Sequence, residues 1–312
     1  MIKSTLLGLA GAVLVGGMAV AAEPESCKAV RFSDVGWTDI TATTALTSVV
    51  LEGLGYQTSA EILSVPVTYQ SLKNGDIDVF LGNWMPTMEA DIAPFKADGS
   101  VETVRANLEG AKYTLAVPKY LADQGLKDYA DIAKFKDQLG GEIYGIEPGN
   151  DGNRLIQKMI DEDKFGLGGF ELVESSEQGM LSQVERVGRD QKPIVFLGWE
   201  PHPMNTRFQL AYLTGGDEVF GPNFGGATVY TNVRKGYVQE CPNVGKLLEN
   251  LTFALPMESE VMGKILDDGM EPKEAATAWL KANPAALDGW LAGVTTFDGG
   301  DGLAAVKGQL GS

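Results

Sequence analysis

Three of the five tryptophans closely follow short apolar runs that predict β-strands. These are Trp37, Trp84 and Trp199, and a glycine precedes each by one or two positions and lets the backbone turn there. Ligands of open α/β sheets bind beyond the carboxyl ends of the strands, so rings presented there could line a site. A quaternary ammonium group has no N–H to donate and depends on attraction to aromatic faces. The three rings together predict a site for a methylated cation, although each taken singly could be a core residue.

Two further side chains fit the same chemistry. Tyr113 lies in a predicted strand over residues 112–117 and would supply a fourth ring. Asp39 follows Trp37 by two positions, which in an extended loop places both side chains on one side, where a carboxylate could offset the charge of a cation. The alternative role of Asp39 is the N-cap of a predicted helix over residues 41–54.

Asn150 and Asp151 lie in a glycine-flanked loop before a predicted helix over residues 153–161. The amide of Asn150 and free backbone N–H groups in this loop could hold a ligand oxygen. Turn formation and N-capping are the alternative interpretation. We therefore include both residues among the candidate ligand-binding positions.

Signs of catalysis are weak. The sequence contains no Gly-x-Ser-x-Gly nucleophile motif, and its glycine-rich stretches lack the Lys-Ser/Thr of a phosphate-binding loop. The single histidine, His202, stands between two prolines and cannot build a multi-histidine metal site, so we expect a structural role for it. We predict a non-enzymatic protein that needs no cofactor and no metal.

Strand-like and helix-like segments alternate along the chain, which predicts an α/β fold with parallel sheets covered by helices. The expected strands are residues 30–32, 61–67, 77–81, 112–117, 142–146 and 194–197, and the expected helices are 41–54, 68–74, 153–161, 243–255, 259–268 and 272–282. The segments 112–117 and 209–213 are the candidates for crossings between two lobes.

Composition narrows the class of partner. The 312 residues are 44% hydrophobic, which suits two ordinary domains and excludes intrinsic disorder. The formal net charge of −17 repels phosphate backbones and anionic membrane surfaces, so nucleic acid is a poor partner. Neutral or cationic small ligands suit this charge better.

The first 21 residues have the pattern of a secretory signal peptide. Lys3 precedes an apolar run over residues 6–20, and Ala19-Val20-Ala21 fits the cleavage rule. The run is too short for a comfortable transmembrane helix. Two cysteines, Cys27 and Cys241, in an exported chain indicate one disulfide, with two free thiols or a lipid-anchored Cys27 as alternatives.

Four segments carry a specific resemblance over nearly the whole mature chain: GWTD at 36–39, GNWMP at 82–86, EPGND at 147–151 and GWEPH at 198–202. They resemble the signature segments of the glycine betaine/choline substrate-binding proteins of ABC importers, and most closely those of its choline-binding members. The resemblance implies a two-lobed periplasmic-binding-protein fold of type II with a ligand cleft between the lobes. We expect residues 22–112 and 210–312 in lobe I and residues 113–209 in lobe II.

The resemblance also implies roles for individual residues. Trp37, Trp84, Tyr113 and Trp199 would form a cation–π box around a trimethylammonium group. Asp39 would supply negative charge near it, and Asn150 would bind the hydroxyl end of choline. The single disulfide of the family would fall on Cys27 and Cys241.

The function implied is a monomeric periplasmic receptor that captures choline and hands it to the permease of an ABC importer. Acetylcholine is a possible second ligand. The alternatives are a receptor for glycine betaine or proline betaine, a periplasmic sensor of choline, and a secreted hydrolase of choline esters. A carboxylate such as Asp39 beside the ligand would oppose the carboxylate of a betaine, which favours choline.

Overall fold

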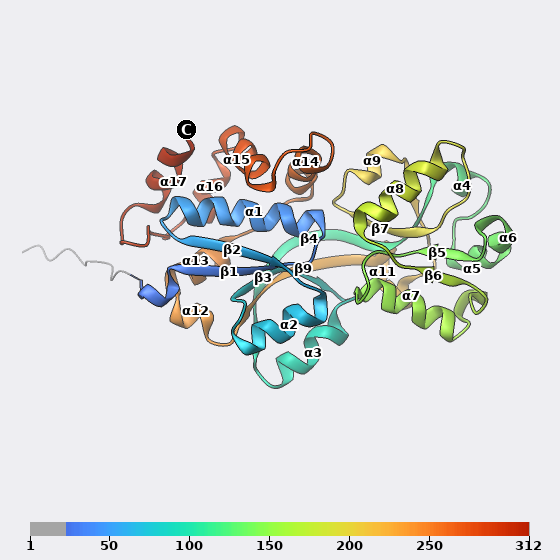
Figure 1. Ribbon diagram of the computed structural model, residues 1–312, viewed down its shortest axis with the longest axis horizontal. Helices are drawn as coiled ribbons and strands as arrows, with labels where there is room; N and C mark the ends of the chain where they lie inside the picture. Colours follow the sequence, from blue (N-terminus) through green and yellow to red (C-terminus); the bar gives the residue numbers. More distant parts are fainter. Residues whose placement is uncertain (1–22, 312) are drawn as a thin grey trace, which may run out of the picture.

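The structure is a computed structural model that describes residues 23–311. The predicted signal peptide, residues 1–21, lies outside the described residues. Figure 1 shows two lobes joined by the long strands β4 (Val101–Pro118) and β9 (Gly226–Arg234). The prediction of a two-lobed α/β fold is therefore confirmed. Among the described residues, no helix is both long and apolar enough to cross a bilayer.

The strands form one continuous sheet in the order β2-β1-β3-β9-β4-β7-β5-β6, with β8 paired to β4. The remaining strands are β1 (Ala29–Asp34), β2 (Gln57–Ile62), β3 (Val79–Met85), β5 (Glu142–Tyr144), β6 (Glu171–Val173), β7 (Phe196–Glu200) and β8 (Leu210–Tyr212). Strand β1 pairs in parallel with β2 and β3, and β5 pairs in parallel with β6 and β7. Strand β9 runs antiparallel to both β3 and β4. Each lobe thus has its own parallel unit, and β4 and β9 connect the two.

Helices cover the sheet of the first lobe on both faces (Figure 1). One face carries α1 (Thr38–Gly53), α14 (Leu255–Leu266), α15 (Pro272–Ala282), α16 (Ala286–Trp290) and α17 (Gly302–Leu310), and the other carries α2 (Val65–Asn74), α3 (Glu89–Ala97) and α12 (Tyr237–Glu240). Helix α13 (Pro242–Asn250) follows α12. Helix α1 is buried over most of its surface because α14 and α15 contact it in addition to the sheet. This burial fixes the position of the N-terminus of α1.

The second lobe has shorter helices. They are α4 (Lys119–Asp123), α5 (Tyr129–Ile132), α6 (Lys136–Leu139), α7 (Asp151–Asp161), α8 (Glu177–Gly188), α9 (Met204–Arg207), α10 (Asp217–Phe220) and α11 (Pro222–Gly225), with single 3-10 turns at Ala133–Phe135 and Lys164–Gly166. A further 3-10 turn, Glu25–Cys27, precedes β1 in the first lobe. Figure 1 places α8 and α9 on one face of this lobe and α7 on the other. Helices α7 and α8 both begin near the first lobe, which brings their first residues to the boundary between the lobes.

Two expectations from the sequence are wrong. The predicted strand over 61–67 is the end of β2 followed by the start of α2, because Pro66 suits the first turn of a helix, where its missing N–H costs nothing. The predicted second crossing at 209–213 is the short strand β8, which pairs only with the end of β4, and β9 crosses instead. The precise lobe boundaries stay a prediction.

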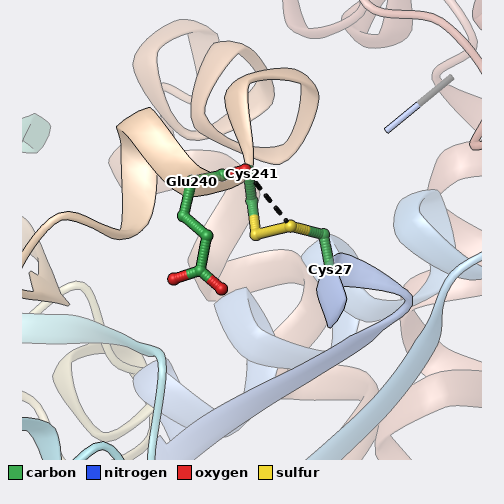
Figure 2. Close-up of side chains that lie close together, drawn as sticks. All are labelled: Cys27, Glu240 and Cys241. Atoms are coloured by element: carbon green, nitrogen blue, oxygen red, sulfur yellow. Dashed lines mark hydrogen bonds between the residues drawn. A yellow bond between two sulfur atoms is a disulfide. The ribbon is translucent and has the colours of Figure 1, made fainter. Parts of the chain in front are cut away.

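The predicted disulfide is confirmed. Cys27 and Cys241 are joined with a Cα–Cα distance of 5.6 Å, so neither is a free thiol (Figure 2). The Cys27 sulfur lies 3.4 Å from the carbonyl oxygen of Glu240. These three residues are also the one group of potential metal donors found close together in the described part of the chain, but both sulfurs are taken up by the disulfide. The bond ties the 3-10 turn Glu25–Cys27 to the residue that precedes α13.

Candidate functional site

A small cavity lies between the lobes. Four aromatic residues, two carboxylates and one aliphatic side chain line it: Trp37, Trp84, Tyr113, Trp199, Asp39, Asp151 and Ile146. Six of the seven sequence-predicted site residues line it, and Asn150 does not. Ile146 was not predicted, because an isoleucine at the end of a strand looks like ordinary core.

Each tryptophan is held at a defined point of the backbone. Gly36 adopts a φ of +82°, which favours glycine and turns the chain from β1 into Trp37, the residue that precedes α1. Trp84 and Trp199 occupy the last position but one of β3 and β7. These two strands run further than the sequence indicated, so both rings project from regular sheet rather than from loops. Rings on strands are positioned more rigidly than rings on loops.

The rings meet around Tyr113. Its ring centroid lies 6.0 Å from that of Trp84 and 6.4 Å from that of Trp199. The interplanar angles are 60° and 76°, so the three rings are inclined to one another rather than stacked. Phe220 supports Tyr113 edge-on at 5.8 Å. Inclined rings can present π-faces and edges to one small guest, which is the arrangement of an aromatic cage.

Asp39 is one of the two carboxyl groups in the cavity wall. It is neither in an extended loop nor the N-cap of its helix, because α1 begins at Thr38 and Asp39 lies in its first turn, where the helix dipole favours a carboxylate. The Nε1–H of Trp84 donates to its Oδ2 at 3.1 Å, and its Oδ1 has no hydrogen-bond partner among the described residues. Burial, followed by repulsion from Glu177, raises the pKa of Asp39 to about 8. A cation in the cavity would relieve both effects.

A second carboxylate, that of Asp151, faces the cavity from the start of α7. It is fully buried, and its Oδ2 likewise has no partner among residues 23–311. Burial raises its pKa to about 6. Two unpartnered buried carboxylate oxygens in one small cavity are costly without a compensating charge or donor.

Asn150 does not line the cavity, and its hydrogen bonds match the alternative role of N-cap. Its Oδ1 accepts hydrogen bonds from the Tyr113 hydroxyl at 2.9 Å and from the backbone N–H of Asn153 at 3.1 Å. It is therefore the N-cap of α7 and a support for one wall of the cage. Gly152 completes this contact, because a Cβ there would lie 2.0 Å from the Tyr113 hydroxyl. Direct contact of Asn150 with a ligand stays a prediction.

Hydrogen bonds cross the cleft beside the cavity. The Nε1–H of Trp37 donates to Glu147, and the backbone N–H of Thr38 donates to Glu177 at 2.8 Å. Burial raises the pKa of Glu147 to about 7. Glu177 has no local signature in the sequence that would have singled it out. It is recognisable only because the fold carries the start of α8 to the start of α1.

The composition of the cavity wall limits the chemistry available. No serine, cysteine, histidine, lysine or arginine lines it within the described residues. The described wall therefore offers no cationic side chain for binding an anionic group. Aromatic faces together with carboxylates fit the recognition of a small cation.

Comparisons with known proteins agree with this chemistry. A family model described as the substrate binding domain of ABC-type glycine betaine transport systems matches residues 28–282. A solved ABC-transporter choline binding protein in complex with choline is 69% identical, with a TM-score of 0.91, covering 92% of this chain and 100% of that one. An unliganded semi-closed structure, also 69% identical with the same coverage, has a TM-score of 0.85. The present structure is thus nearer in shape to the liganded one.

A curated relative is more distant. The glycine betaine/carnitine transport binding protein of Listeria monocytogenes is 33% identical over 163 residues. The match covers 52% of this chain and 53% of that protein, about half of each.

Proposed function

The chain belongs to the family of substrate-binding domains of ABC-type glycine betaine transport systems, and we propose that it captures choline and delivers it to a membrane permease. The signal-peptide pattern supports action in the periplasm after export. The family and the similar solved structures are substrate-binding transport proteins, which supports binding rather than catalysis. A 69% identical protein has been solved with choline bound. No second copy is needed to complete the cavity, so we propose a monomer.

One observation carries the choice of ligand. Asp39 Oδ1 and Asp151 Oδ2 are buried, without partners among the described residues, in the same aromatic cavity. A trimethylammonium group placed between the rings would be attracted to their faces and to both carboxylates. The hydroxyl of choline could donate a hydrogen bond to a carboxylate oxygen that otherwise has none. Choline would therefore supply both a positive charge and a hydrogen-bond donor to the carboxylates of the cavity.

Glycine betaine suits the cavity less well. Its carboxylate needs hydrogen-bond donors, and the described wall offers two acids and no cationic side chain. Like charges facing each other in a buried site cost affinity. Acetylcholine keeps the methylated cation and lacks the carboxylate. We place it second because its acetyl group makes it bulkier than choline.

Isothermal titration calorimetry against choline, acetylcholine, glycine betaine and proline betaine tests this ranking. We expect choline to bind most tightly, with a dissociation constant between tens of nanomolar and low micromolar, because small ligands gain at most about 1.5 kcal/mol per heavy atom. Both betaines should bind at least tenfold more weakly. Tighter binding of a betaine, or turnover of acetylcholine to choline by the pure protein, would contradict the proposal.

A further inference from the structure

We propose that Glu177, positioned by His202, is a latch that grips Thr38 across the cleft and sets how long a bound ligand is retained. The inference rests on the proposed function, because it needs a ligand that enters while the lobes are apart. It gives a role to the single histidine and to a buried glutamate that lies outside the cavity wall. Neither residue needs to touch the ligand.

Glu177 receives three hydrogen bonds. Its Oε2 accepts from the backbone N–H of Thr38 at 2.8 Å, and its Oε1 accepts from the Thr38 hydroxyl at 2.5 Å. His202 Nε2 lies 3.1 Å from the same Oε1. Thr38 is the first residue of α1 in one lobe, and Glu177 is the first residue of α8 in the other. The carboxylate therefore occupies the positive end of a helix from the opposite lobe.

The hydrogen bonds of His202 determine its protonation. The backbone N–H of Met204 donates to Nδ1 at 2.9 Å, so Nδ1 carries no proton. A neutral ring must then carry its proton on Nε2, which makes Nε2 the donor to Glu177. All three hydrogen bonds thus point into one carboxylate. Because His202 and Glu177 belong to the same lobe, this part of the latch can persist when the lobes separate.

The latch is also connected to the binding cavity at two points. Thr38 lies between Trp37 and Asp39, both of which line the cavity. On the other side, the His202 ring packs edge-on against the cavity residue Trp199, with centroids 5.0 Å apart. When Trp37 and Trp199 both close on one ligand, Thr38 and Glu177 therefore come within hydrogen-bonding distance of each other.

Lobe separation would break only part of this network. A hinge opening between the lobes removes both hydrogen bonds from Thr38 while leaving the one from His202. Glu177 is 1% exposed here, and water would replace Thr38 as its partner once the cleft opens. The latch consequently stabilises the closed, ligand-bound form and contributes nothing to the first encounter between ligand and open protein.

Stopped-flow tryptophan fluorescence with choline tests the latch by separating the two rate constants. Thr38→Val, which keeps the shape of the side chain and removes its hydroxyl, should raise the dissociation rate constant about tenfold, as expected for loss of a hydrogen bond to a charged group. The association rate constant should stay within twofold. Thr38→Ser restores the hydroxyl and should return dissociation close to that of the natural protein.

Two variants complete the design. Thr47→Val is the matched control, because the buried Thr47 on the same helix donates its hydroxyl to the Thr43 carbonyl within one lobe, so both rate constants should be unchanged. In a Glu177→Ala background the hydroxyl of Thr38 has no acceptor at position 177, so adding Thr38→Val should not change the dissociation rate constant further.

The outcomes distinguish this inference from the proposed function. If the natural protein binds no quaternary ammonium compound, the proposed function fails. If it binds choline and Thr38→Val leaves dissociation unchanged, or slows association as much as it speeds dissociation, the latch is refuted while the proposed function stands.

Discussion

At the scale of single residues, the proposed cage would require rings with a π-face rather than only apolar side chains. Trp199→Leu keeps an apolar side chain and removes the ring, so we expect choline binding at least tenfold weaker, corresponding to loss of a contact worth about 2 kcal/mol. Calorimetric titration measures this directly. Trp290→Leu is the control, because Trp290 is equally buried but packs on Phe253 away from the cavity. Equal loss of affinity in both variants would point to general destabilisation instead.

The raised pKa of Asp39 predicts that binding depends on pH. Its pKa of about 8 means that the carboxyl is largely protonated at pH 7 in the empty site, whereas a bound cation favours the ionised form. Binding therefore releases a proton, and affinity should rise with pH toward about 8, by at most tenfold per unit, and then level off. Calorimetric titrations at pH 6–9 in buffers of different ionisation enthalpy measure the affinity at each pH and the number of protons released on binding.

The variant Asp39→Asn isolates this effect. It should bind choline more weakly and show a flatter pH profile, because the amide does not titrate. An unchanged profile would assign the dependence to Asp151 or Glu147, whose pKa values burial raises to about 6 and about 7.

At the scale of elements, helix starts carry much of the site. Asp39 lies in the first turn of α1, Asp151 begins α7 and Glu177 begins α8. The positive end of a helix dipole stabilises each of the three carboxylates, and this offsets part of the free-energy cost of burying them. The site therefore gathers negative side chains where the backbone tolerates them best.

The disulfide predicts a change in stability without a change in binding. It closes a separation of 214 residues, which corresponds to roughly 5 kcal/mol in the chain-entropy model as an upper figure. Cys27→Ser combined with Cys241→Ser should lower the free energy of unfolding in urea by several kcal/mol. The choline dissociation constant should stay within twofold, because neither residue lines the cavity. If the fully folded double variant bound choline much more weakly, the disulfide would also be needed for the geometry of the site.

At the scale of the whole molecule, the two lobes contribute complementary halves of the cage. Trp37, Asp39 and Trp84 come from elements that precede β4, and Asp151 and Trp199 come from elements that follow it. Figure 1 shows β4 and β9 as the connections between the lobes, and a connection of two strands permits a hinge. Outside the cavity, Arg154 and Asp91 form a further contact across the cleft, a two-pronged ion pair with distances of 2.9 and 2.6 Å. Closure thus forms the cage and its surrounding contacts together.

The sequence alone determined the local features of the protein. The alternation of strands and helices, the helix Pro272–Ala282 and the tryptophans near strand ends are encoded by neighbouring residues, which is why they were predicted correctly. The four signature segments likewise identified five residues that the structure brings to one cavity, and the predicted strand over 112–117 supplied a sixth, Tyr113. The pairing of Cys27 with Cys241 followed from there being only two cysteines.

Only the tertiary structure decided the contacts between distant segments. Thr38 and Glu177 are 139 positions apart, and nothing near either residue indicates the other as a partner. The support of Tyr113 by Asn150 and the crossing by β9 depend in the same way on how the lobes are joined. Hydrophobic periodicity and helix capping depend on a few neighbouring residues, whereas the geometry of a closed cleft depends on the packing of the entire chain.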